Sequence, residues 1–303
     1  MLLGASGQVG SRLLPRLVEF GEVSAPGHSQ LDLGSETSLR AAVRALEPAI
    51  IINAAAYTAV DRAESEPEAA LRANAVAPGV LAEEAKRCRA LLVHYSTDYV
   101  FDGKKAAPYL EGDPTNPLNQ YGRSKRLGEQ GVAAADGAYL ILRTGWVYTG
   151  RGSNFLLTML RLGAEREVLR VVDDQLGTPT PAEVVADATL ALLRHCRQAA
   201  DPYEYARNLS GIYHAGCEGQ TSWYRFALAI FAAARHGALG AGLKVTQVVP
   251  ITTEEYPTPA QRPRYSVLSK EKITRTFAFS PPCWEDGLGR IMQQLADGNH
   301  SRG

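Results

Sequence analysis

A glycine-rich turn close to the first residue most constrains the fold of this chain. The spacing G-x-x-G-x-x-G spans Gly4–Gly10 and directly follows the apolar residues Met1–Leu3. Glycines at this spacing permit a tight turn and close backbone approach, and the N–H groups of a helix that begins there can bind a pyrophosphate. We therefore expect a helix over Val9–Phe20, kinked at Pro15, and a short first strand whose start is missing.

Apolar segments alternate with segments of helical spacing after this turn. The expected strands are Val23–Ala25, Ile50–Ala56, Leu91–Tyr95 and Leu140–Arg143, and the expected helices are Glu66–Arg89 and Asn119–Gly131. This alternation is typical of a doubly wound parallel sheet. We therefore predict an α/β fold with a Rossmann-like, NAD(P)-binding domain over residues 1–145.

The second half of the chain has a different pattern. Helices are expected over Ala182–His195 and Ser222–Arg235, strands over Ile212–His214 and Val245–Ile251, and an irregular surface over Tyr256–Arg264. Because the regular alternation is lost, we expect a smaller, interleaved substrate-binding lobe over residues 146–303, with some segments returning to the first domain. Such a lobe would cover the carboxyl ends of the strands, where open α/β sheets bind ligands.

Tyr121 and Lys125 stand four residues apart and therefore share one face of the expected helix. A free tyrosine has a pKa of roughly 10, and a nearby ammonium favours its phenolate. Ser96 and Thr97 add two hydroxyls at the end of a candidate strand. A hydroxyl, a phenol and an ammonium around one carbonyl would polarise it and deliver a proton, so this set predicts a reductase site that also needs a hydride donor.

The tip of the second expected strand bears on the choice of cofactor. Folds that prefer NAD often place an acid there to bind the ribose 2′-hydroxyl, whereas this chain has Gly27-His28. The missing carboxylate leaves room for a 2′-phosphate, so we expect NADPH, with NADH tolerated. Asp32 is expected near the adenine, or as the cap of a helix that begins near Glu36.

Charge and cysteine content argue against several classes of function. The chain has 32 basic and 32 acidic residues, so its net charge is zero and we expect neither nucleic acid nor an anionic membrane as partner. The four cysteines show no C-x-x-C spacing, and no apolar run reaches about 18 residues. We therefore expect a cytoplasmic protein with reduced thiols and no metal centre, in which His94 and His214 are packed core residues.

Four motifs resemble the extended short-chain dehydrogenases/reductases. They are G-x-x-G-x-x-G at Gly4–Gly10, N-A-A-A at Asn53–Ala56, S-T-D-Y-V-F-D-G at Ser96–Gly103 and Y-G-R-S-K at Tyr121–Lys125. Within that family the chain closely resembles the dTDP-4-dehydrorhamnose reductases. The motifs that carry this closer resemblance are P-L-N-Q-Y-G at Pro117–Gly122, R-T-G-W-V-Y at Arg143–Tyr148, G-I-Y-H at Gly211–His214 and R-P-R-Y-S-V-L at Arg262–Leu268.

This resemblance implies NADPH-dependent reduction of the 4-keto group of dTDP-4-dehydro-6-deoxy-L-mannose, the last step of dTDP-L-rhamnose synthesis. It implies that Tyr121 donates the proton to the sugar O4, that Lys125 binds the nicotinamide ribose and lowers the Tyr121 pKa, and that Thr97 hydrogen-bonds the keto oxygen. The implied cofactor-binding residues are Gly4, Gly7, Gln8, Val9, Gly10, Asp32, Leu33, Ala56, Tyr57, Thr58, Tyr95, Tyr121 and Lys125. Asp98 and Trp146 are implied to contact the sugar, and the wide face of the Trp146 indole suits the apolar side of a deoxyhexose.

Two positions depart from the family's pattern. Some members carry an acid at the start of the first helix that helps to bind Mg²⁺ at a dimer contact, whereas this chain has Ser11-Arg12 there, with Glu183 retained on a later helix. The departure argues against a Mg²⁺ site and leaves a monomer or a homodimer open. Gly145 replaces a more usual serine, which removes one hydroxyl near the sugar.

Two other functions remain open at this point. The regulatory subunit of methionine adenosyltransferase resembles this family and acts as a binding partner rather than a reductase. A reductase or epimerase of another nucleotide sugar is the second alternative. Retention of Thr97, Tyr121 and Lys125 favours the enzymatic reading over the first, and the Asp98 and Trp146 motifs argue against the second.

Overall fold

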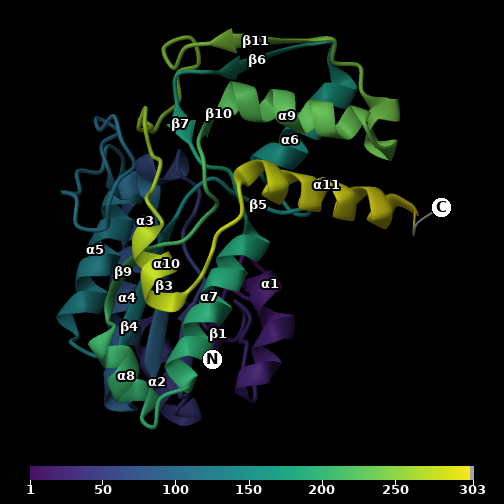
Figure 1. Ribbon diagram of the computed structural model, residues 1–303. Coiled ribbons are helices and arrows are strands. Elements are labelled where there is room, and N and C mark those ends of the chain that lie inside the picture. Colours follow the sequence, from purple (N-terminus) through teal and green to yellow (C-terminus); the bar gives the residue numbers. More distant parts are fainter. Residues whose placement is uncertain (301–303) are drawn as a thin grey trace.

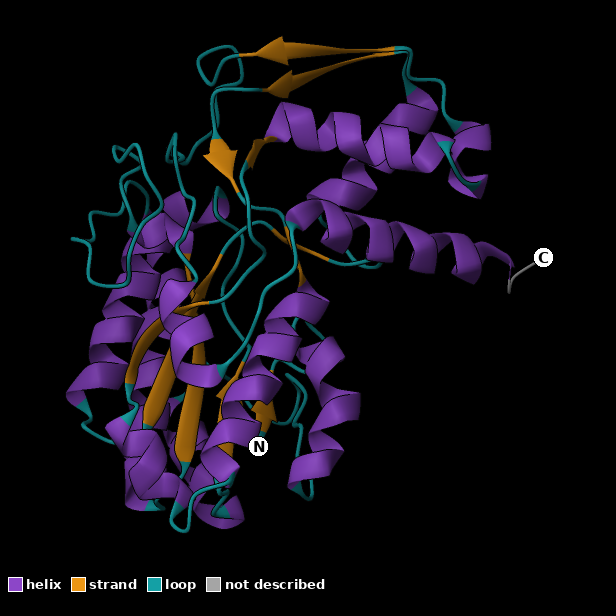
Figure 2. Ribbon diagram, in the orientation of Figure 1, coloured by secondary structure: helices purple, strands orange, loops and turns teal. Residues whose placement is uncertain are grey.

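The computed structural model describes residues 1–300 and has a parallel sheet of five strands at its centre (Figures 1 and 2). The strands lie in the order β1 (Leu2–Leu3), β2 (Ile50–Asn53), β3 (Leu91–Thr97), β4 (Tyr139–Thr144) and β9 (Gly211–His214). Each neighbouring pair is parallel. The predicted α/β fold with a central parallel sheet is therefore confirmed.

Helices cover both faces of this sheet, and each face has its own apolar core (Figure 2). One face packs against α2 (Glu36–Leu46), α4 (Ala77–Arg87) and α5 (Gln120–Ala134). The other packs against α1 (Gly10–Leu13), the 3₁₀ helix η1 (Leu14–Phe20), α7 (Ala182–Arg197), α8 (Pro202–Asn208) and α10 (Glu271–Phe277). Buried parallel strands need apolar cover on both sides, which explains their nearly continuous apolar sequences.

A second group of elements lies beyond the carboxyl ends of the strands and has a separate apolar core (Figure 1). Its members are α6 (Phe155–Glu165), β6 (Val168–Val172), α9 (Trp223–Arg235), β11 (Gln247–Ile251) and α11 (Trp284–His300). Two short pairs connect it to the sheet: β5 (Val147–Tyr148) with β8 (Thr180–Pro181), and β7 (Leu176–Gly177) with β10 (Thr221–Ser222). Because α7, α8, β9 and α10 pack with the sheet, the second half of the chain contributes to a core of the sheet as well as to the separate core. The division of the domains at residue 145 stays a prediction.

Several elements differ from those expected. Val23–Ala25 is not a strand; only one backbone hydrogen bond joins it to β1, from the Leu2 N–H to the Ser24 carbonyl at 2.8 Å. The expected helix over Glu66–Arg89 is divided into α3 (Pro67–Leu71), a π-helical segment η3 (Arg72–Val76) and α4. The helix after the glycine turn changes from α to 3₁₀ at Leu14, next to Pro15, because proline lacks the N–H that an α-helix requires.

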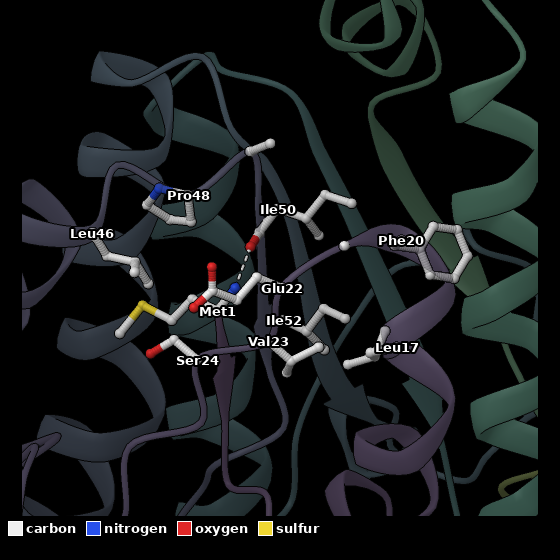
Figure 3. A pocket seen from close by; sticks show the side chains of 12 residues that line it. Met1, Leu17, Phe20, Glu22, Val23, Ser24, Leu46, Pro48, Ile50 and Ile52 are labelled. Atoms are coloured by element: carbon white, nitrogen blue, oxygen red, sulfur yellow. Dashed lines mark hydrogen bonds between the residues drawn. The ribbon is translucent and has the colours of Figure 1, made fainter.

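A cavity of about 340 Å³ lies beside the amino end of β1 and is lined by side chains such as Leu17, Phe20 and Ile50 (Figure 3). The N-terminal amine of Met1 donates a hydrogen bond to the Ile50 carbonyl there, at 2.8 Å. This cavity is at the end of the sheet opposite the carboxyl ends of the strands, so we do not consider it a candidate active site. Within residues 1–300, no helix combines the length and the apolarity that crossing a membrane requires.

Candidate active site

The carboxyl end of β3 and the first turn of α5 bring the predicted catalytic residues together. Thr97 is the last residue of β3, and a 3₁₀ turn, η4 (Asp98–Val100), follows it. Asn119 caps α5 by accepting a hydrogen bond from the Gly122 N–H at 2.8 Å. A Cβ on Gly122 would lie 2.2 Å from the Tyr99 carbonyl oxygen, so only glycine lets α5 start this close to the turn.

Tyr121 lies beside Thr97 and edge-on to Tyr99, with ring centroids 6.1 Å apart. Burial raises the pKa of Tyr121 to about 12; a hydrogen bond with Thr97 opposes this shift and the Asp98 charge adds to it. Desolvation of the phenolate is the largest effect on this pKa, and the expected lowering of the Tyr121 pKa by Lys125 stays a prediction. Tyr121 is therefore a phenol that keeps its proton at neutral pH.

Lys125 lies one helical turn further along α5 and is only 2% exposed. Its Nζ donates a hydrogen bond to the Tyr95 carbonyl oxygen. Burial lowers the pKa of Lys125 to about 8, and the nearby Glu129 carboxylate opposes this shift. The Tyr95 hydroxyl points elsewhere, to Thr189 of α7 at 2.6 Å, so Tyr95 faces the site with its backbone rather than its side chain.

Asp98 is 2% exposed and sits directly behind Thr97. The Thr97 hydroxyl donates to Asp98 Oδ1 at 3.0 Å and accepts from the Tyr99 N–H at 3.1 Å. Burial raises the pKa of Asp98 to about 6, against the opposing effect of the Ser266 and Thr97 hydroxyls. Asp98 is thus placed to act on Thr97.

Trp146 follows β4 with φ at +50°, a left-handed conformation that is uncommon for any residue except glycine. Its indole stacks on Trp223 of α9, with centroids 3.4 Å and planes 3° apart. Gly177 packs against the ring so closely that a Cβ there would lie 2.3 Å from Trp146 Cε2. One face of the Trp146 indole is therefore covered by Trp223, a residue to which the sequence motifs assigned no role.

The glycine turn has the compactness that a pyrophosphate site requires. Gly4 has φ at +76°, and a Cβ on Gly10 would lie 2.1 Å from the Gly4 carbonyl oxygen. The N–H groups that open a helix lack intrahelical acceptors, so Val9 and its neighbours can face an anion. The Gln8 side chain instead donates to the Val147 carbonyl at 3.2 Å and accepts from Asn154 at 3.2 Å, which joins the turn to β5 and α6.

The expected cofactor segment Ala56–Thr58 is held against α5 by Asn74 of η3, a residue to which sequence analysis assigned no role. The Asn74 side chain accepts from the Tyr57 N–H at 2.9 Å and donates to the Tyr57 carbonyl at 3.0 Å. It also donates to the Ser124 hydroxyl at 3.0 Å. No sequence signal pointed to Asn74; its place is revealed by the π-helical segment, a structural feature that occurs often at functional sites.

The two remaining cofactor candidates lie in the loop before α2. Asp32 is exposed, and its Oδ1 accepts a hydrogen bond from the Gly34 N–H at 2.8 Å. Asp32 does not cap α2; Ser35 does, by accepting from the Ser38 N–H at 3.3 Å. Leu33 is half-buried and packs against the core beside α2.

No cluster of three metal-ligating side chains exists among the described residues. The Arg12 guanidinium lies 3.0 Å from a Glu183 carboxylate oxygen, so an internal cation already accompanies this acid. His94 and His214 are both buried; the first contacts Asn53 at 3.2 Å and the second the Ser269 carbonyl at 3.1 Å.

Comparison with known proteins identifies the family. The family model described as RmlD substrate binding domain matches residues 1–297. The dTDP-4-dehydrorhamnose reductase of Burkholderia thailandensis is 47% identical over 296 residues, which are 97% of this chain and 98% of that protein. The enzyme of the same name from Escherichia coli K12 is 42% identical over 299 residues, covering 97% of each chain.

Solved structures agree with this assignment. A dTDP-4-dehydrorhamnose reductase from Clostridium acetobutylicum has a TM-score of 0.86 and 36% identity, covering 97% of this chain and 98% of that chain. The Bacillus anthracis enzyme in complex with NADP has a TM-score of 0.85 at the same identity and coverage. Similarity of sequence and fold thus extends over nearly the full length of these proteins, and the chain belongs to the dTDP-4-dehydrorhamnose reductase family.

Proposed function

We propose that the chain reduces the 4-keto group of dTDP-4-dehydrorhamnose with NADPH and releases dTDP-L-rhamnose, the last step of dTDP-rhamnose biosynthesis. The observation that carries the proposal is the convergence of Thr97, Tyr121 and Lys125 at the carboxyl end of β3. The chain that holds them is 47% identical to the dTDP-4-dehydrorhamnose reductase of Burkholderia thailandensis. A dTDP-sugar is therefore the expected substrate. The proposal includes the residue roles given below and a cytoplasmic location. The protein is proposed to be a monomer or a homodimer.

The glycine turn and the adjoining segment fit a dinucleotide, because Gly4 and Gly10 let the backbone of the turn pack closely on itself and on Ala54, which leaves the N–H groups at the start of α1 open to a ligand. The N–H groups of Gln8 and Val9 would hold the pyrophosphate, with Gly7 as part of the turn. Ala56, Tyr57 and Thr58 would line the cofactor, and Asp32 and Leu33 would face its adenosine end. Bound NADPH supplies the hydride for the sugar carbonyl carbon.

Tyr121 would give its proton to the sugar O4. A pKa of about 12 keeps the hydroxyl protonated at neutral pH, and the reduced sugar, as an alkoxide, is basic enough to take that proton. Lys125 would bind the nicotinamide ribose, and a charge on its Nζ would stabilise the phenolate that remains. Thr97 and Asp98 would contact the sugar, with Trp146 beside them. Holding donor and ketone together is worth on the order of 7–11 kcal/mol of the barrier when the two are fully oriented.

NADPH oxidation at 340 nm with enzymatically generated dTDP-4-dehydrorhamnose tests the proposal. We expect rapid turnover by the natural chain and a loss of about 10²- to 10⁴-fold in kcat for Tyr121→Phe, with NADPH binding intact by fluorescence. Tyr256→Phe is the matched control, because Tyr256 is 60% exposed. Unchanged turnover in Tyr121→Phe would remove Tyr121 from the chemistry.

A natural chain that binds NADPH but does not reduce dTDP-4-dehydrorhamnose would contradict the proposed substrate. A panel of other nucleotide sugars would then identify a related reductase or epimerase. Stoichiometric recovery of a methionine adenosyltransferase, with no activity on any sugar, would instead favour a regulatory role.

A further inference from the structure

At the end of β4, a side chain at position 145 would occupy the space that the Asp98 carboxylate fills. A Cβ on Gly145 would lie 2.5 Å from both Cγ and Oδ2 of Asp98, and 2.8 Å from its Oδ1. Gly145 is not among the residues with positive φ, so its backbone would accept a side chain. A side chain at position 145 would therefore require the Asp98 carboxyl to move, whereas the backbone conformation would not oppose it. The carboxylate of Asp98 fills the place that a serine side chain would take.

The Asp98 carboxylate in that place is incompletely paired. Its Oδ1 accepts from Thr97 and the carboxylate also interacts with the Ser266 hydroxyl, whereas its Oδ2 has no partner at ordinary hydrogen-bond geometry within the described part of the chain. A small cavity beside it has room for about one water and is lined in part by Thr180, Ser266 and Lys270. A buried carboxylate with one unpaired oxygen is strongly disfavoured as an anion, so this position promotes its protonation.

The protonation state of Asp98 determines whether the Thr97 hydroxyl can donate a hydrogen bond to a substrate. Thr97 has a single hydroxyl proton and donates it to Asp98 Oδ1, while its oxygen accepts from the Tyr99 N–H. With this arrangement Thr97 has no proton for a keto oxygen. If Asp98 carries a proton, Asp98 can donate to Thr97, and the Thr97 hydroxyl becomes free to donate to the substrate beside Tyr121.

We propose that Gly145 is a positioning residue, because its missing side chain leaves the space in which the Asp98 carboxyl lies against Thr97. Protonation of Asp98 in that place then allows the Thr97 hydroxyl to donate a hydrogen bond to the keto oxygen. This inference rests on the proposed reductase function and adds a second hydrogen-bond donor to it. Two donors on the developing alkoxide stabilise it more than Tyr121 alone.

Other charged and titratable groups face Asp98 from the elements packed around it. Tyr99 and Tyr121 interact with its charge, and Lys270 lines the adjoining cavity. Arg262 hydrogen-bonds Tyr99 from the irregular segment before Tyr265. None of these charged groups hydrogen-bonds the carboxylate directly; its hydroxyl partners are Ser266 and Thr97, and of these two Thr97 is the one that lies beside Tyr121.

The experiment measures kcat with NADPH and dTDP-4-dehydrorhamnose between pH 5 and 9, together with Tm. We expect kcat of the natural chain to rise as pH falls towards 6, and this rise to be absent in Asp98→Asn, whose amide does not titrate. Gly145→Ala is expected to lower kcat by about 10- to 100-fold, as a misplaced site group does, with NADPH affinity unchanged. Gly112→Ala is the matched control, because Gly112 has no atom within 4 Å of an added Cβ.

The double variant Asp98→Ala/Gly145→Ala separates steric competition from a backbone effect. In the double variant the space of the Asp98 carboxyl is free for the alanine methyl group at position 145. We therefore expect its Tm and kcat to equal those of Asp98→Ala, even if Gly145→Ala by itself fails to fold. Equal losses from Gly145→Ala in both backgrounds, or a natural pH profile in Gly145→Ala, would overturn the inference. A natural chain without reductase activity would overturn the proposed function as well, whereas an active chain without coupling between positions 98 and 145 would overturn this inference alone.

Discussion

The indole of Trp146 stacks face to face on that of Trp223, with centroids 3.4 Å apart. The first residue follows β4 of the central sheet, and the second opens α9 in the other core. Phe155 of α6 packs on Trp223 at 4.6 Å. The aromatic stack thus joins the end of the central sheet to the separate core around α9, at the edge of the proposed sugar site.

Replacing Trp223 tests this stack. We expect Trp223→Ala to lower the free energy of unfolding by about 2–4 kcal/mol through lost packing, and to raise KM for the sugar while KM for NADPH stays constant. The reason is that Trp146 loses the partner that holds its left-handed backbone. Urea unfolding and steady-state kinetics measure both effects. Trp223→Phe keeps a stacking ring, and an equal rise in KM with that variant would contradict the explanation.

Lys125 is predicted to reduce the stability of the fold. Its pKa is about 8 in the fold and 10.5 ordinarily, so the unfolded chain binds more protons between these values, and stability rises with pH across that window. At pH 7 the buried ammonium therefore costs about 3 kcal/mol. Lys125→Met should unfold at higher urea concentration at pH 7 while losing reductase activity. The exposed Lys104→Met is the control; a less stable Lys125→Met would show that the hydrogen bond to Tyr95 outweighs desolvation.

Asp98 is expected to make stability fall as pH rises from about 4 to 6. Its pKa is about 6 in the fold and 3.8 ordinarily, so the folded chain binds more protons in this window, and the stabilisation by the protonated form is lost above it. Asp98→Asn should therefore gain more stability over the natural chain at pH 8 than at pH 4. Chemical unfolding at both pH values measures the difference. Asp136→Asn, at an exposed site, should show no such trend.

Asn74 is predicted to couple cofactor binding to the position of α5. Asn74→Ala removes three hydrogen bonds and leaves backbone groups of Tyr57 unpaired, which costs about 2–4 kcal/mol of unfolding free energy. The NADPH dissociation constant should rise, as measured by fluorescence titration. Asn116→Ala, which removes one exposed hydrogen bond, should leave NADPH binding unchanged. Natural NADPH affinity in Asn74→Ala would show that the segment Ala56–Thr58 holds its position without this residue.

Chelation is expected to leave activity and oligomeric state unchanged. Glu183 has the Arg12 guanidinium 3.0 Å away, and that cation supplies the positive charge that a divalent metal would otherwise bring. Turnover and size-exclusion chromatography with and without EDTA measure this. Activity that falls with EDTA and returns with added Mg²⁺ would contradict the prediction.

Local sequence signals predicted most of the elements, and they failed where distant contacts decide. Strands Ile50–Asn53 and Leu91–Thr97 are largely apolar because both of their faces are buried, and α5 begins at the expected place, where the structure shows the Asn119 side chain as its cap. Val23–Ala25 is not a strand, because the hydrogen bond from the Leu2 N–H to the Ser24 carbonyl does not continue into a ladder. The division of Glu66–Arg89 was missed because the π-helical segment carries the contacts of Asn74 with Tyr57 and Ser124, which lie 17 and 50 residues away.

The sequence by itself determined the fold class, the family and the set of candidate residues, since glycine spacing, strand–helix alternation and the Tyr121–Lys125 spacing are local patterns. Only the tertiary structure decided the chemical state of that set. Burial from all sides raises the pKa of Tyr121 and lowers that of Lys125, an effect that their spacing in the sequence does not reveal. The contacts of Asp98 with Gly145 and of Trp146 with Trp223 were equally invisible in the sequence, because excluded volume and stacking depend on residues that only folding brings together.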